Sequence, residues 1–174
     1  MEKIFLAAFA VIMAGNIIAQ QPTPPQPNGN IINPSLDKFV GTWVWVSGND
    51  TLRIILKKEN ILLPFPENSR ADLLIGFHIY KKGNTVIESS ISNSSSSYID
   101  KQYTILGGNR AGIDNSEITC SIKNLSKNKS GELKLSINSS NSQLSWNLKN
   151  REGVKIGNYD YTFSYLLSLT LQKP

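Results

Sequence analysis

The sequence offers few side chains whose types and spacing could carry out catalysis. His78 is the only histidine and Cys120 the only cysteine among 174 residues, so zinc sites built on several such ligands are excluded. A serine-type triad would have to use His78, but no Gly-x-Ser-x-Gly motif is present. Glycoside hydrolysis needs two carboxylates that face one cleft, and the sequence does not bring a pair together. The scattered candidate carboxylates are Asp72, Glu88, Asp100 and Glu117.

Binding of phosphate or nucleic acid has no better support. Gly107 and Gly108 are followed neither by a helical pattern nor by Gly-Lys-Ser, as a phosphate loop requires. The net charge of +5 is spread along the chain, without a dense basic block interleaved with aromatic residues. We therefore expect a protein that is not an enzyme and that uses no cofactor, metal or nucleic acid. On this basis His78 is expected at the surface or at the edge of a lumen.

The N-terminus indicates export. Residues 4–14 form an apolar run of signal-peptide length, too short to span a bilayer, and Ala19 ends a plausible cleavage site. A transmembrane anchor is the less favoured alternative. We expect residues 1–19 to be a signal peptide, so that the mature chain is periplasmic or secreted. Residues 20–35 then form a proline-rich linker, and residues 36–174 a single β-barrel domain.

A hairpin over residues 36–60 is the plainest structural signal. Trp43 and Trp45 alternate with valines on its first strand, and residues 47–50 (Ser-Gly-Asn-Asp) supply a tight turn. Trp43 is expected to be buried at one end of the fold. Gly41 is expected where a Cβ atom would crowd that tryptophan.

In the remaining chain, apolar and polar residues alternate as they do in β-strands. Residues 71–82 place Phe77 on the face opposite His78, and return strands are expected over residues 85–91 and 98–106. Residues 107–115 read as a loop, and residues 161–173 as one long strand with a bend near 166–167. Cys120 reads as a buried small side chain. Three regular inward rows follow from the pattern: Ile118, Cys120 and Ile122; Leu133, Leu135 and Ile137; Leu144, Trp146 and Leu148.

No segment after residue 19 keeps a helical period, so the fold class is all-β. We predict an antiparallel up-and-down meander of about eight or nine strands that closes as a lipocalin-like barrel, which removes exposed edges.

Two resemblances support this fold. Gly41 and Trp43 resemble the Gly-x-Trp motif on the first strand of lipocalin-type barrels, although the last strand has no arginine to cover the tryptophan and Lys173 is the nearest basic residue. A longer part of the chain resembles a family of small, signal-bearing bacterial proteins of unknown function. That resemblance implies no activity and no site residues. It rests on LDKFVGTW, DLLIG, SWNLKNREGVKI and SLTLQK, between residues 36 and 173.

Three functions remain open from the sequence, of which an unrecognised enzyme is the least favoured. The barrel could bind a small apolar or amphipathic ligand, or it could be a non-catalytic module whose side chains fill the barrel and whose surface contacts an envelope protein or glycan. We expect a monomer in either case. The candidate ligand-binding residues are inward-facing aromatics from separate strands: Trp43, Phe77, Trp146, Phe163 and Tyr165.

Overall fold

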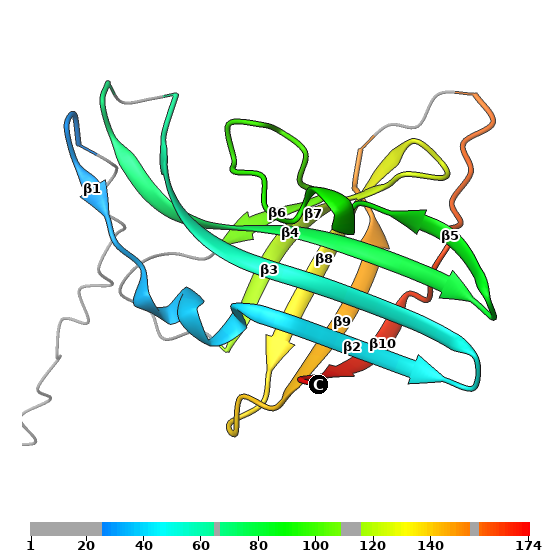
Figure 1. Ribbon diagram of the computed structural model, residues 1–174. Helices are drawn as coiled ribbons and strands as arrows, with labels where there is room; N and C mark the ends of the chain where they lie inside the picture. The colour runs from blue at the N-terminus through cyan, green and yellow to red at the C-terminus, as the bar shows by residue number, and fades with distance from the viewer. Residues whose placement is uncertain (1–25, 65–66, 109–115, 154–156) are drawn as a thin grey trace, which may run out of the picture.

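The computed structural model describes residues 26–64, 67–108, 116–153 and 157–174 (Figure 1). The expected signal peptide and residues 109–115 of the expected loop lie outside these ranges. Within them no helix is long and apolar enough to cross a membrane. The described elements are β1 (Asn30–Ile31), the 3-10 helix η1 (Pro34–Phe39), β2 (Gly41–Ser47), β3 (Asp50–Leu62), β4 (Arg70–Lys82), β5 (Thr85–Ser89), the 3-10 helix η2 (Ile91–Asn93), β6 (Ile105–Gly108), β7 (Glu117–Asn124), β8 (Lys129–Ile137), β9 (Gln143–Asn150) and β10 (Ser168–Gln172).

Eight of these strands close into an antiparallel barrel. They follow one another around it in chain order, β2-β3-β4-β6-β7-β8-β9-β10, and β10 pairs with β2 to complete the circle. The other two strands both add to β4: β1 in parallel and β5 antiparallel. The predicted all-β, up-and-down barrel is therefore confirmed.

The first hairpin forms as predicted, but Gly41 has a different role. β2 and β3 pair without interruption from Gly41↔Leu56 to Ser47↔Asp50, around a turn in which Gly48 has φ 58°. An added Cβ atom at Gly41 would meet nothing within 4 Å, so the crowding prediction was wrong. Gly41 is instead required by its φ of 125°, a value that other residues rarely adopt.

Trp43 closes one end of the barrel, as predicted. It is fully buried, and its Nε1–H donates a 2.8 Å hydrogen bond to the carbonyl oxygen of Phe39 at the end of η1. Leu36 and Phe39 of η1 are also fully buried in the same core cluster. Lys173 lies over the indole, with Nζ 4.9 Å from the ring centroid. The lysine thus stands where the lipocalin resemblance called for an arginine.

Phe77 was predicted on the inward face of β4, but it lies on the opposite face of that strand. An added Cβ atom at Gly76 would lie 2.7 Å from the Leu56 side chain, so Gly76 faces the core and Phe77 faces outward. Phe77 is nevertheless fully buried. Lys57 lies 5.9 Å from its ring and donates to the carbonyl oxygen of Ser94, which shows that the segment between β5 and β6 covers this outer face. The placement of Phe77 inside the barrel was therefore wrong.

Two strand predictions were too long. Residues 98–103 form turns, and the strand after them is β6, which contains the glycines 107 and 108 that were expected in a loop. Residues 161–167 are irregular, and only Ser168–Gln172 form β10. Tyr165 nevertheless faces the core from this irregular stretch, as predicted.

The expected linker joins the fold before residue 36. β1 pairs with Arg70 and Ala71 of β4, and the backbone N–H of Asn33 donates a 2.8 Å hydrogen bond to Asp72. Asn33 is buried. The expected linker is therefore already in contact with the strands of the barrel by residue 30.

Candidate functional site at a barrel seam

The structure brings together three of the five predicted site residues. The Tyr165 ring lies 5.7 Å from that of Trp146, nearly perpendicular to it, and 6.3 Å from that of Phe163. Trp146 and Tyr165 are buried, and Phe163 packs partly buried against them. Trp43 belongs to the same core but has its own contacts with η1. Phe77 lies on the outside of the wall.

Two hydrogen-bond donors in this aromatic group have no partner. Among the described residues, neither Nε1 of Trp146 nor the hydroxyl of Tyr165 has a partner in hydrogen-bond geometry, and both atoms are inaccessible to solvent. Burial, followed by the nearby charge of Glu88, raises the pKa of Tyr165 above its usual value. The Asn124 side chain is close enough to the Tyr165 hydroxyl to oppose part of the rise in its pKa. The tyrosine is therefore a neutral hydroxyl beside a cluster of polar residues.

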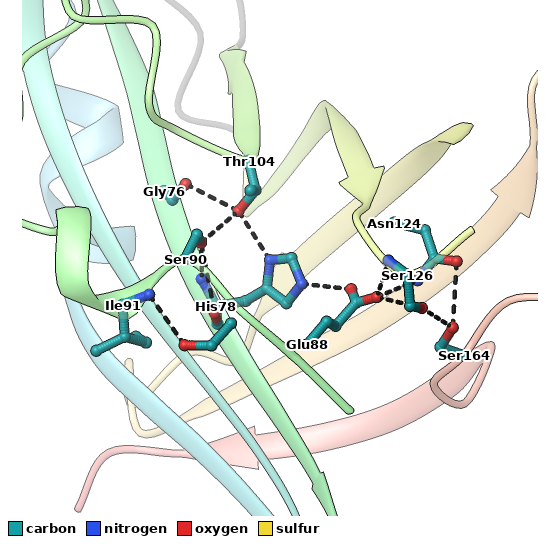
Figure 2. A network of polar contacts seen from close by, with 10 residues as sticks. Gly76, His78, Glu88, Ser90, Ile91, Thr104, Asn124, Ser126 and Ser164 are labelled. Atoms are coloured by element: carbon teal, nitrogen blue, oxygen red, sulfur yellow. Dashed lines mark hydrogen bonds and ion pairs between the residues drawn. The ribbon is translucent and has the colours of Figure 1, made fainter. Parts of the chain in front are cut away.

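That cluster is centred on His78 (Figure 2). The His78 ring lies inside the barrel, edge-on to that of Tyr165. Its Nδ1 is 2.7 Å from the hydroxyl of Thr104, and its Nε2 is 2.6 Å from Oε1 of Glu88. Thr104 lies 3.0 Å from the hydroxyl of Ser90. Since an ionised carboxylate only accepts, Nε2 carries the proton of the bond to Glu88. The prediction of a surface or lumen-edge His78 was wrong, because its side chain is completely buried.

Glu88 spans a gap in the barrel wall. Among the described strands, β5 pairs with β4 only, and no backbone ladder joins it to β7. Oε2 of Glu88 crosses this gap and accepts hydrogen bonds from Nδ2 of Asn124 at 2.7 Å and from the Ser126 backbone N–H at 3.0 Å and hydroxyl at 2.7 Å. Figure 2 shows the carboxylate between the histidine on one side and Asn124 and Ser126 on the other. We call this contact between β5 and the end of β7 the sealed seam.

The electrostatics of the sealed seam favour an ionised glutamate. Burial by itself raises the pKa of Glu88, but the hydrogen bonds from His78 and Ser126 and the charge of the imidazole outweigh it, so the pKa is lowered. A charged carboxylate inside a protein is tolerated only when its lone pairs are used in this way.

Thr104, His78 and Glu88 follow the order hydroxyl, imidazole, carboxylate that hydrolytic triads use. A nucleophile in such a triad must be reachable by a substrate carbonyl. Here the exposed fractions of the three residues are 4%, 0% and 6%, and the Thr104 hydroxyl is already engaged by Ser90. The arrangement therefore holds strands together in this structure and presents no attacking group to solvent.

The other candidate carboxylates have different partners. Asp72 binds Asn33, Asp100 binds Ser97, and Glu117 pairs with Lys134. In the ranges that the structure covers, no three His, Cys, Asp or Glu side chains gather as a metal site would need.

Sequence reasoning named His78 and Glu88 but did not join them. They are ten residues apart on neighbouring strands, and the β4–β5 register shifts between Tyr80 and Lys81. A charged residue at an inward position of a short strand is the signal that could have marked Glu88. Asn124 and Ser126 lie more than thirty residues further on, beyond the reach of local patterns.

Comparison with known proteins agrees with the resemblance found in the sequence. No curated protein and no solved structure is significantly similar to the chain. The model of a family of unknown function, DUF6705, matches residues 1–165. Because this match covers nearly the whole chain, the protein belongs to the family of unknown function DUF6705.

Proposed function

We propose that the protein is a non-catalytic contact module, in which a barrel filled by its own side chains supports a binding surface. The observation that carries this proposal is the core. Phe39, Trp43, Leu135 and Trp146 have no accessible surface at all. A side chain that lines a void large enough for water keeps some accessible surface, so their complete burial supports a filled interior.

The proposal includes export from the cytoplasm. Residues 1–19 act as a signal peptide, the mature chain is periplasmic or secreted, and the monomer contacts an envelope protein or a glycan. The apolar run and the cleavage site at Ala19 support this. Intact-mass measurement of the protein from the cells that make it should find a chain starting at residue 20, and a chain that still starts at Met1 would contradict export by cleavage.

The unpaired Trp146 and Tyr165 donors favour a second candidate function, a lipocalin-like carrier of a small apolar or amphipathic ligand. Leaving a buried donor unsatisfied costs about 1–3 kcal/mol. A ligand with an acceptor oxygen could remove this cost if the core opened to admit it. Trp43, Phe163, Trp146 and Tyr165 would line such a site, while the outward Phe77 would not.

Titration with an uncharged, environment-sensitive dye such as Nile red separates the two candidates. For the filled barrel we expect no saturable binding by the parent protein. The Leu135→Ala variant should bind the dye, because removing a fully buried leucine leaves a cavity. This variant is the positive control, since dye binding by it shows that the assay detects an opened barrel. Saturable binding by the parent that Tyr165→Phe or Trp146→Phe weakens, without loss of folding, would favour the carrier.

A further inference from the structure

A second gap in the barrel wall lies between β2 and β10. These strands share a single pair, Gln172↔Val44. In the same register the next two pairs would join Trp45 with Leu171 and Val46 with Thr170, yet Trp45, Val46 and Thr170 line an open cleft of about 420 Å³ instead. Each strand remains regular on its other side, since β2 pairs with β3 as far as Ser47 and β10 with β9 as far as Ser168. Figure 1 shows β2 and β3 continuing to their turn, with β4 beside β3. We call this gap the open seam.

The lining of the open seam combines apolar, polar and cationic residues: Val44, Trp45, Val46 and Pro174; Thr170 and Gln172; Arg53 and Lys173. Trp45 is half-buried and packs against the core, and Val46 is 63% exposed. Arg53 and Lys173 bring two positive charges to the cleft, and no Asp or Glu side chain lines it. Arg53 has no ion pair with another residue in the described part of the chain. Val44 and Val46 of β2 share one face of that strand, Trp45 lies on its other face, and the two lining residues of β10, Thr170 and Gln172, share a single face.

The size and charge of the open seam define what could occupy it. A volume of about 420 Å³ falls in the range of small-molecule sites, roughly 300–1,000 Å³. The two cations favour a ligand with an anionic group, and Trp45 with the valines favours a ligand with an apolar body. An added peptide strand fits less well, because only residues 45–47 of β2 remain beyond the last pair with β10.

We propose that the open seam binds a small organic anion with an apolar body, such as a medium-chain carboxylate. The carboxylate lies between Arg53 and Lys173, and the chain lies along Trp45 and Val46 in place of the missing rung. This inference rests on the proposed function, because it places binding on the outer surface of the barrel. It adds which part of that surface binds and which class of ligand is bound.

Isothermal titration of the full chain with decanoate, below its micelle concentration, tests the proposal. We expect saturable one-to-one binding that weakens with added salt. Decanol, which lacks the charge, should bind more weakly. Arg53→Gln should weaken decanoate binding by about two- to fivefold, the effect of one exposed ion pair. Arg151→Gln removes the same charge at an exposed position that does not line the cleft, and it should leave the affinity unchanged.

A second pair of variants addresses the apolar side without disturbing the core. Val46→Asp should weaken decanoate binding more than tenfold, because it puts a carboxylate beside the ligand. Val86→Asp, at another exposed valine of a strand, should not. The proposal is overturned if decanoate does not bind, if decanol binds equally well, or if each cleft variant matches its control. If Tyr165→Phe weakens decanoate binding and Val46→Asp does not, the ligand lies inside the barrel. That result would overturn the filled-barrel proposal as well. Absence of any binding would overturn the open-seam proposal alone.

Discussion

Among the described strands, the backbone ladder of the barrel wall stops at two places, which differ in how the gap is filled. At the sealed seam, Glu88 crosses from β5 to Asn124 and Ser126, and His78 completes a buried network. At the open seam, β2 and β10 separate after one pair, and the space between them stays open. The first gap has its polar groups satisfied by side chains, and the second leaves cations and apolar side chains facing solvent.

This difference indicates that the sealed seam contributes to stability and that the open seam is available for binding. A buried network with every lone pair used holds the strands together and has no group left for a ligand. An open gap contributes little to stability, but it keeps side chains ready for contact. The following predictions rank the expected effects from the sealed seam to the open one.

Glu88→Ala should cause the largest loss of stability, about 3–5 kcal/mol, because it removes a buried carboxylate and leaves its buried hydrogen-bond donors without an acceptor. Nε2 of His78 and Nδ2 of Asn124 would lose their acceptor. Urea unfolding followed by circular dichroism measures the change. Glu132→Ala, which breaks a solvent-exposed pair with Lys149, should cost at most about 1 kcal/mol. Equal urea midpoints for the two variants would mean that Glu88 does not hold the seam.

Acid should weaken the sealed seam through the same carboxylate. The pKa of Glu88 is lowered in the folded protein, so its contribution is complete above the unfolded value of about 4.3 and is lost as the pH falls through the folded value. The free energy of unfolding of the parent should therefore fall between pH 6 and pH 3 by more than that of Glu88→Gln. Parallel pH profiles for the two proteins would contradict the assignment.

Cys120 can report whether the wall next to the sealed seam opens. Burial raises the pKa of its thiol to about 12, so little thiolate forms at neutral pH. It packs closely against β6, since an added Cβ atom at Gly107 would lie 2.5 Å from its Sγ. Labelling by a thiol reagent should be slow in the native parent and faster in Glu88→Ala at low denaturant. Native labelling as fast as that of the unfolded chain would show that this part of the wall is not closed.

Arg53→Gln should have the smallest effect on stability, within about 0.5 kcal/mol, because the side chain is exposed and has no ion pair among the described residues. Thermal unfolding without ligand measures this. A large loss of stability would give Arg53 a structural role and weaken the contrast between the seams.

The sequence predicts the wall of the barrel better than its seams. β7, β8 and β9 alternate strictly and are joined by short turns, so the inward rows containing Cys120, Leu135 and Trp146 were assigned correctly. β4 misled the reasoning because both of its faces are buried: His78 faces the core and Phe77 lies under the segment between β5 and β6. Alternation cannot tell the inside from the outside when both sides are apolar.

The seams depend on contacts that local patterns do not contain. Glu88 meets Ser126 across 38 residues of sequence, and a register shift in the β4–β5 pairing helps to place it. Residues 161–167 alternate like a strand, and Tyr165 faces the core as that pattern predicts, but the strand itself starts only at Ser168. In the register of the Gln172↔Val44 pair, β10 is long enough to reach the end of β2, so the open seam exists because the two strands separate and not because β10 is short.

Amide chemical shifts recorded by NMR during a decanoate titration test the contrast between the seams most directly, because one spectrum reports on both. The account predicts saturable shifts for Val46 and Thr170 at the open seam, and unchanged positions for His78, Glu88 and Asn124 at the sealed seam. Shifts concentrated at His78, Glu88 and Tyr165, with Val46 and Thr170 unmoved, would contradict it and place the binding site inside the barrel.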